Sequence, residues 1–196
     1  YSRVRDMLST VSEPQRATAP TTTLDDSDVV LRDGSTVHVR ATGPADVDGV
    51  AAFLGDLSPD ARWFRFLGGG LRVERAAREL VGRGTGLVAV AGPEETVVAH
   101  ASFIPETRDR AELAVAVADA WQGHGIATLL LAHLAQLAEA SGIATFVAWV
   151  HPSNRRMLQV FRDSGFPIKV RFEPGLLKIE LPFELVRVAD LPEAGR

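Results

Sequence analysis

The sequence predicts a mixed α/β domain whose central sheet is largely antiparallel and flanked by helices. Two apolar runs at 87–91 and 96–104, separated by a short turn, have the pattern of a β-hairpin. Segments with helical spacing of apolar residues alternate with further strand patterns along the rest of the chain. A strand–helix–strand unit over about 111–150 adds a mixed element near the end of the sheet.

Length and composition are those of one folded domain. The chain has 196 residues, of which 46% are hydrophobic, and this is enough for a core without disulfides or a structural metal. Residues 1–28 are rich in Ser, Thr, Pro and Asp and are predicted to be a flexible linker. The folded domain is expected at 29–183, followed by a polar tail at 184–196.

Composition also excludes several classes of function. A net charge of −4 argues against a general nucleic-acid binder, which needs a basic surface. No apolar run approaches the roughly 20 residues of a membrane-spanning helix. The chain has no cysteine, which excludes a cysteine nucleophile and thiolate metal sites and fits a cytoplasmic location.

The first half of the domain is predicted to contain two strands and three helices. Asp33-Gly34 is typical of a tight hairpin turn. Pro44 opens the first helix, and Ser58 followed by Pro59 has the pattern of an N-cap and first helical position. The predicted elements are strands at 29–31 and 36–40 and helices at 44–55, 59–67 and 73–81.

The second half is predicted to contain six strands and two helices. Gly92-Pro93-Glu94-Glu95 forms the turn of the hairpin, and Gly142 ends a long apolar helix. The predicted strands are 87–91, 96–104, 111–117, 143–150, 166–172 and 176–181, and the predicted helices are 126–140 and 152–165.

A loop with two glycines joins the strand at 111–117 to the helix at 126–140. This arrangement directs several backbone N–H groups and the positive end of a helix dipole into one small volume. Gly123 and Gly125 would let a ligand approach the backbone closely. The loop therefore suits an anion such as phosphate. A tight turn with no ligand is the alternative, and the loop alone leaves both interpretations open.

Two other phosphate-binding motifs are excluded. A kinase-type P-loop needs a lysine directly after a glycine, and neither Lys169 nor Lys178 follows one. A dinucleotide-binding loop needs a third Gly or Ala where Thr128 stands.

The loop resembles a known pyrophosphate-binding motif. The GNAT acyl-CoA-dependent N-acetyltransferases have Gln or Arg, two residues, Gly, one residue, and then Gly or Ala. The segment Gln122-Gly123-His124-Gly125-Ile126-Ala127 matches this pattern in full. Asn154 and the pair Gly165-Phe166 stand where the family usually carries an Asn and a Gly-Phe. The resemblance covers about residues 30–183 and implies the GNAT fold.

Within this family the chain is similar to the bacterial Pat-type protein lysine acetyltransferases. The similarity lies in Leu-Arg-Asp-Gly-Ser at 31–35, Leu-Ser-Pro at 57–59, Arg-Trp-Phe-Arg-Phe at 62–66 and Ala-Glu-Leu-Ala-Val at 111–115. Such domains are often fused to an NDP-forming acyl-CoA synthetase-like domain or a cyclic-nucleotide-binding domain. This chain resembles the catalytic domain alone, and a fused regulatory domain is an expected partner in a longer protein.

Glu112 is the candidate general base. It is the only charged residue in the strand at 111–117, where alternation places it on one face with Ala114 and Ala116. An acceptor lysine, with an unperturbed pKa of about 10.4, must lose a proton before its nitrogen attacks a thioester. A half-buried carboxylate can take that proton directly or through one water. From the residues alone a solvated charge is the alternative; the glutamate at this place in Pat-type domains is the catalytic base.

The resemblance implies acetyl-CoA as co-substrate and no metal. Backbone groups of 115–117 would form hydrogen bonds with the pantetheine arm, and the loop would hold the pyrophosphate. Thr128 could add a hydroxyl to the pyrophosphate site, and Asn154 would form a hydrogen bond with the pantetheine. Each of these roles has a structural alternative: core packing for 115–117, a solvent-facing position for His124, a helix-interior position for Thr128 and a first-turn position for Asn154. The expected cofactor-binding residues are Val115, Ala116, Val117, Gln122, Gly123, His124, Gly125, Ile126, Ala127, Thr128 and Asn154.

One departure from the family concerns the general acid. Many GNAT enzymes carry a Tyr where this chain has Phe161, so we expect the CoA thiolate to leave without a dedicated acid, by direct transfer in a ternary complex. The aromatic and Arg-rich stretch at 62–66 is interpreted as core packing on at least one face, with a partner surface as the alternative. The remaining histidines are expected to be structural or at the surface: His38, His100, His133 and His151.

The leading functional hypothesis is a protein lysine acetyltransferase that uses acetyl-CoA. The resemblance implies AMP-forming acyl-CoA synthetases as the protein substrates, which acetylation would inactivate. A small-molecule amine N-acetyltransferase and a non-catalytic acyl-CoA-sensing module are the alternatives, and Glu112 argues against the second of them.

Overall fold

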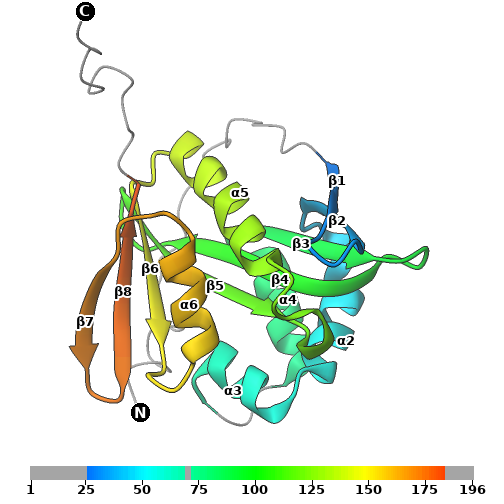
Figure 1. The fold of residues 1–196 in the computed structure, drawn as a ribbon, viewed down its shortest axis with the longest axis horizontal. Helices are drawn as coiled ribbons and strands as arrows, with labels where there is room; N and C mark the ends of the chain where they lie inside the picture. Colours follow the sequence, from blue (N-terminus) through cyan, green and yellow to red (C-terminus); the bar gives the residue numbers. More distant parts are fainter. Residues whose placement is uncertain (1–25, 69–71, 184–196) are drawn as a thin grey trace, which may run out of the picture.

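A single eight-stranded sheet forms the centre of the molecule (Figure 1). The structure is a computed structural model that describes residues 26–68 and 72–183. The strand order is β1-β2-β3-β4-β5-β6-β8-β7, and among these neighbours only β5 and β6 run parallel. The strands are β1 (Ser27–Val30), β2 (Thr36–Ala41), β3 (Thr85–Ala91), β4 (Thr96–Pro105), β5 (Arg110–Val117), β6 (Thr145–Val150), β7 (Lys169–Glu173) and β8 (Leu176–Pro182).

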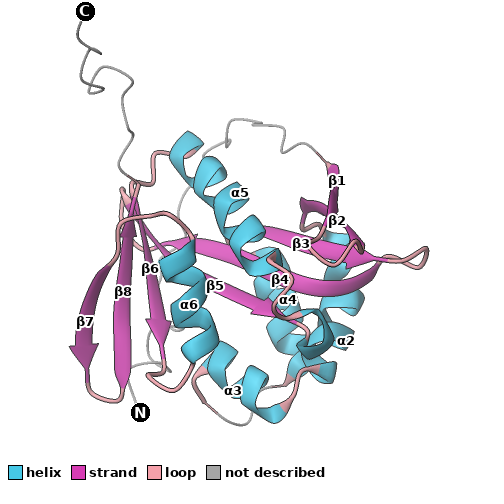
Figure 2. Ribbon diagram, in the orientation of Figure 1, coloured by secondary structure: helices cyan, strands magenta, loops and turns pink. Residues whose placement is uncertain are grey.

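Helices cover both faces of the sheet, as Figure 2 shows. The long α5 and the shorter α6 pack on one face, while α2 and α4 pack on the other. The helical elements of the described ranges are η1 (Pro44–Asp46), α2 (Val47–Asp56), α3 (Pro59–Phe66), α4 (Val73–Gly82), η2 (Asp119–Trp121), α5 (Ile126–Ala140) and α6 (Arg155–Asp163). The predicted mixed α/β class with a largely antiparallel sheet is confirmed. None of the helices in 26–68 and 72–183 is long and apolar enough to cross a bilayer.

The sheet separates two hydrophobic cores. The larger core lies under α5 and α6 and includes the fully buried Leu130, Leu134 and Phe146. The smaller core lies under α2 and α4. Because side chains alternate along a strand, β5 contributes Leu113 to the larger core and Ala116 to the smaller one.

Several element boundaries differ from the prediction. β6 begins at Thr145 and not at Ile143, and α6 spans Arg155–Asp163 and not 152–165. β1 begins at Ser27, inside the expected linker, whose residues 1–25 lie outside the described ranges, as does the expected tail at 184–196. β3 begins at Thr85, two residues early, because Thr85 and Gly86 still pair with β4. β7 begins at Lys169 and not at Phe166, since Pro167 lacks the N–H that a ladder needs.

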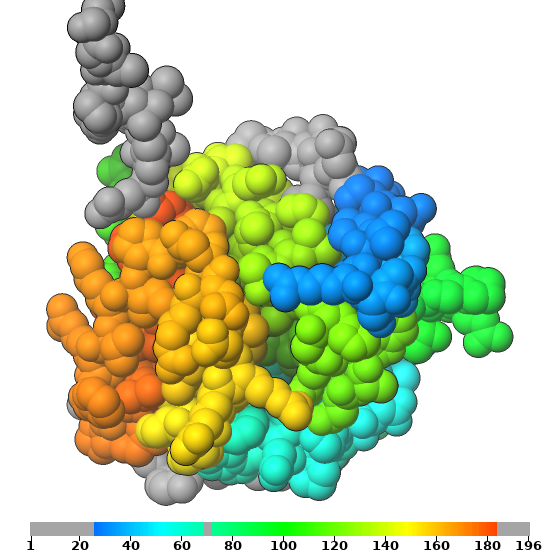
Figure 3. All heavy atoms as spheres, viewed as in Figure 1, coloured from blue at the N-terminus to red at the C-terminus, as the bar shows by residue number. Residues whose placement is uncertain are grey.

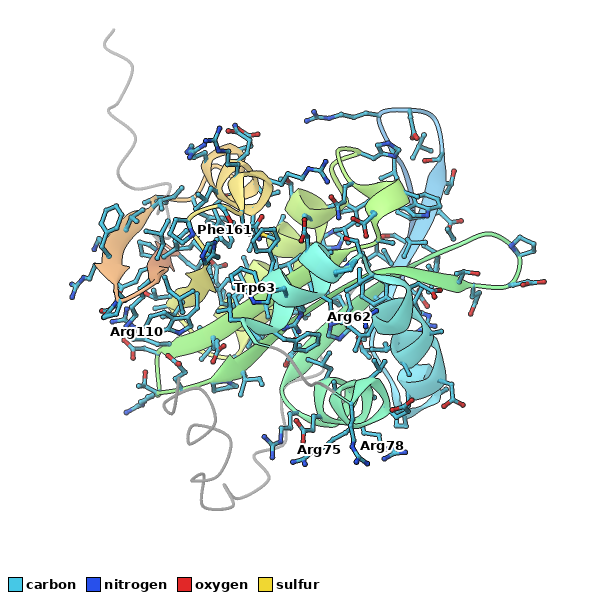
Figure 4. All side chains as sticks on the ribbon, turned by 90° about the horizontal axis from the view of Figure 1, so that it is seen from below. Arg62, Trp63, Arg75, Arg78, Arg110 and Phe161 are labelled. Atoms are coloured by element: carbon cyan, nitrogen blue, oxygen red, sulfur yellow. The ribbon has the colours of Figure 1, made fainter. Side chains whose placement is uncertain are left out.

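Polar contacts hold α3 beneath β5. The Ser58 hydroxyl accepts a hydrogen bond from Ala61 N at 3.3 Å, which confirms the predicted N-cap. The Ser58 N–H and hydroxyl also donate to the carboxylate of Asp119, which follows β5, at 3.0 and 2.9 Å. Arg62 ties α3 to the end of α2 through the carbonyl of Leu57 at 3.2 Å. In Figure 4, Arg62 and Trp63 project from α3 in different directions.

Candidate active site

A wedge opens in the sheet where β5 and β6 separate. The two strands pair only from Arg110 to Glu112, opposite Thr145 to Val147. β4 continues to pair with β5 as far as Val117, so residues 113–117 have a neighbour on one side only. We call the space between residues 113–117 of β5 and residues 148–150 of β6 the wedge; Figure 1 shows the two strands diverging there.

The backbone of β5 offers hydrogen bonds to this wedge. Ala118 N donates to Val98 O at 2.8 Å, toward β4. Because backbone groups alternate in direction along a strand, Ala116 also faces β4, while Val115 and Val117 face the wedge. The Val117 carbonyl accepts from Gln122 Nε2 at 3.0 Å, which agrees with this alternation. An extended ligand in the wedge could therefore pair with Val115 and Val117 but not with the backbone of Ala116.

The glycine loop ends at the N-terminus of α5. Gly123 and Gly125 have φ angles of 87° and 92°, and a Cβ at either position would meet no atom within 4 Å. No side chain caps α5 and its first turn has no acidic residue, so the first N–H groups keep their capacity to bind an anion. The Ile126 side chain is buried in the core, which leaves its N–H for a ligand. Ala127 and Thr128 are half-buried beside it.

Two side chains of the loop already have partners. His124, an expected phosphate contact with a solvent-facing position as the alternative, is about one-third exposed at 32% and lies 3.0 Å from the Asp33 carboxylate. The Gln122 amide oxygen accepts a hydrogen bond from Arg156 in the first turn of α6. Sequence reasoning missed Arg156. Its signal is a cation just after Asn154, but it stands 34 positions after Gln122, so the sequence does not show that the two side chains meet.

Asn154 and Phe161 both have structural contacts. The Asn154 side chain accepts a hydrogen bond from Met157 N at 3.1 Å and so caps α6. This is the first-turn position considered for it, and its contact with pantetheine stays a prediction. Phe161 is buried in the larger core.

Glu112 lies at the closed end of the wedge. Its side chain is on the β5 face that carries Ala116 and that α3 covers, as alternation predicts. Ile104 of β4 is directly opposite and exposed. Burial raises the pKa of Glu112; the neighbouring Glu106 raises it further and Arg65 lowers it. A half-buried carboxylate with a raised pKa is suited to accept a proton near neutral pH.

Two ionisable side chains on the face of the sheet that carries Glu112, Arg65 and His100, have buried nitrogens without hydrogen-bond partners. Arg65 of α3 has Nε and Nη2 atoms that are buried and lack hydrogen-bond partners, and burial lowers its pKa to about 10. His100 of β4 is fully buried, and burial, with a smaller effect of Arg65, lowers its pKa to about 3. The expectation that His100 is structural agrees with this position. No group of three or more His, Asp or Glu side chains within 26–68 and 72–183 is arranged to hold a metal ion.

Comparison with known proteins assigns the family. The sequence pattern of the acetyltransferase (GNAT) family matches residues 59–166, more than half of the chain. The chain belongs to the GNAT acetyltransferase family. The GNAT domain of S. lividans PAT is 34% identical with a TM-score of 0.69, over 80% of this chain and 96% of that one. No curated protein matches the chain.

More distant GNAT structures share the fold. A cAMP-binding acyltransferase from Mycobacterium smegmatis is 23% identical with a TM-score of 0.57, over 85% of this chain and 50% of that one. The acetyltransferase yncA from Salmonella typhimurium, solved with its cofactor acetyl-CoA, is 21% identical with a TM-score of 0.59, over 80% of this chain and 99% of that one. As a GNAT enzyme, this chain is an acetyl-CoA-dependent acetyltransferase.

Proposed function

We propose that this GNAT acetyltransferase transfers the acetyl group of acetyl-CoA to a lysine of a protein, and that the protein is an AMP-forming acyl-CoA synthetase. The observation that carries the proposal is the 34% identity to the GNAT domain of S. lividans PAT over 96% of that domain. It agrees with the Pat-type motifs of the sequence. A cytoplasmic location, expected from the sequence, is part of the same proposal.

The open wedge and the glycine loop suit acetyl-CoA. The unpaired backbone groups of Val115 and Val117 would bond the extended pantetheine arm, and the first N–H groups of α5 would bind the pyrophosphate. Arg156 adds a positive charge beside this loop. Acetyl-CoA supplies the acetyl thioester.

Glu112 is the proposed general base. Its carboxylate would take one proton from the lysine ammonium, directly or through one water. The neutral nitrogen then forms a bond to the thioester carbonyl carbon, the C–S bond breaks, and CoA leaves as a thiolate. The second proton of the nitrogen passes to solvent water, which leaves a neutral amide. Phe161 is apolar and buried, so it donates no proton; a thiol with a pKa of about 8.5 leaves without one.

The surroundings of Glu112 support a protein acceptor. Ile104, opposite Glu112 on β4, is 41% exposed, and Trp63 on α3 is 39% exposed. Trp63 stacks edge-on with His151, which follows β6, at 4.6 Å between ring centroids. Figure 3 shows a hollowed surface between α6 and the segment that leads into α5, with α3 beside it. Exposed aromatic and aliphatic groups beside a hollow are typical of protein-binding surfaces.

The test is acetylation of a purified AMP-forming acetyl-CoA synthetase. The enzyme, acetyl-CoA and the synthetase are incubated together, modified lysines are mapped by mass spectrometry, and ligase activity is measured. We expect a catalytic lysine of the synthetase to be acetylated and ligase activity to fall, because acetylation removes a positive charge. Glu112→Gln is the matched inactive control. If no lysine is acetylated above the enzyme-free control while a free amine or polyamine turns over, the protein is a small-molecule acetyltransferase.

A further inference from the structure

Arg65 is a half-buried cation on the helix that packs against the proposed base's strand, and two of its guanidinium nitrogens are buried without a hydrogen-bond partner. It lies on α3, under the face of β5 that carries Glu112, and its Nε and Nη2 atoms are shielded from solvent with no acceptor in reach. Arg62, one turn earlier on the same helix, differs because its guanidinium donates to backbone carbonyls of Gly55 and Leu57. The two arginines of α3 therefore have different environments.

Stability alone does not account for Arg65. A buried charge without partners loses its hydration and gains no hydrogen bonds in return. An apolar side chain of similar size at such a position often leaves a protein as stable or makes it more stable. The Arg65 guanidinium lies over the Phe66 ring, 5.2 Å from its centroid. Beyond this contact it contributes chiefly its positive charge, so the relevant question is which group that charge acts on.

The charges that face Glu112 have opposite signs. Arg65 approaches from α3, and Glu106 follows the end of β4. The directly opposed residues on β4 and β6 are the apolar Ile104 and Val147. Arg110, two residues before Glu112 on β5, is bound by Glu180 of β8.

Deeper in the fold, His100 on β4 is neutral near physiological pH because its pKa is about 3. Its neutral ring does not offset either charge. Arg65 is therefore the cation that balances Glu106 at the carboxylate of Glu112 among the described residues.

We propose that Arg65 is a positioning residue for the transfer reaction, whose unpaired charge keeps the half-buried carboxylate of Glu112 ionised and ready to accept the lysine proton. The proposal rests on the proposed role of Glu112 as base. Arg65 touches neither acetyl group nor acceptor in this scheme and acts only through Glu112. Because no hydrogen bond is involved, any residue that keeps the positive charge serves the same role.

The experiment measures kcat/KM against pH for the wild type and for Arg65→Met, Arg65→Lys and Glu106→Gln. CoA release from acetyl-CoA is followed, with Nα-acetyl-lysine amide as a free acceptor, so that the result is independent of any synthetase. In Arg65→Met the loss of a cation disfavours the carboxylate, so the acid limb of the profile moves to higher pH. In Glu106→Gln the loss of an anion favours the carboxylate, so the acid limb moves to lower pH. Arg65→Lys keeps the wild-type limb.

A control and a double variant separate this role from a structural one. Arg62→Met breaks hydrogen bonds of the same helix, so it lowers the melting temperature and leaves the acid limb in place. Arg65→Met leaves the melting temperature unchanged or raises it. The double variant of Arg65→Met with Glu112→Gln is no slower than Glu112→Gln alone, because both changes act on the same group.

Two results have distinct meanings. If Glu112→Gln reacts at the wild-type rate, the proposed base is wrong and the role of Arg65 falls with it. If Glu112→Gln is slow while Arg65→Met keeps the wild-type acid limb, or the two losses multiply in the double variant, Glu112 remains the base and the inference about Arg65 is overturned.

Discussion

Replacement of Gly125 by valine tests the anion site at the start of α5. Gly125 has φ +92°, and a Cβ there would meet no protein atom within 4 Å. A Cβ at this position therefore causes no clash in the free protein. It adds backbone strain of about 1–2 kcal/mol, the cost of a left-handed conformation for an L-residue, and it fills the space that the pyrophosphate would use.

The two effects can be measured separately. Strain of about 1–2 kcal/mol corresponds to a melting temperature lower by roughly 2–8 °C for a domain of this size. Loss of one hydrogen bond to a charged phosphate costs about 1.5–3 kcal/mol, which raises the Kd for acetyl-CoA roughly 10- to 150-fold.

Gly142→Val provides a matched control at the other end of the same helix. Gly142 has φ +81° and equally open surroundings, so its replacement imposes the same kind of strain away from the loop. Calorimetric titration with acetyl-CoA and thermal denaturation are carried out on both variants. We expect similar melting temperatures and a weakened affinity only in Gly125→Val. Equal affinities in the two variants would refute the assignment of the loop to the pyrophosphate.

Three further predictions concern Glu112, Asn154 and His38. Glu112→Gln should lower kcat by about 10²–10⁴-fold with unchanged acetyl-CoA affinity and recover in part at high pH, where lysine deprotonates unaided; in the wild type, activity should fall as pH drops through the raised pKa of Glu112. Asn154→Ala should cost about 0.5–2 kcal/mol in chemical denaturation through loss of the α6 cap. The hydrogen bond to Asp28 raises the pKa of His38. The stabilisation of β1 by this hydrogen bond is therefore complete below the ordinary histidine pKa of 6.5 and is lost as pH rises through the raised pKa. His38→Gln should remove this pH dependence from thermal melts.

Local patterns were enough to predict the elements of the site. The period-two strand placed Glu112 and Ala116 on one face, and the glycine pair before an apolar run predicted the N-terminus of α5. Both signals depend on residues adjacent in the chain, so no tertiary information is needed to see them. The N-cap at Ser58 was visible for the same reason.

The contacts between elements could not be predicted in this way. The helix α3, which carries Arg65, is held against β5 because Ser58 is hydrogen-bonded to Asp119, 61 residues further along the chain. The point at which β5 and β6 separate depends on strand register, which nothing in the two strand sequences specifies. The bond between Arg156 and Gln122 likewise depends on how α6 packs beside the loop.

The wedge leaves the protein with an unpaired sheet edge in its interior. Unpaired edges are templates for strands of other chains, and proteins normally shorten, charge or cover them. This edge spans only residues 113–117 and is closed at one end by the pairs that finish at Glu112. A single extended chain can enter the wedge from its open end. A β-ribbon of another molecule would need a wedge that is open at both ends. The shape that admits a ligand therefore also protects the molecule against aggregation through this edge.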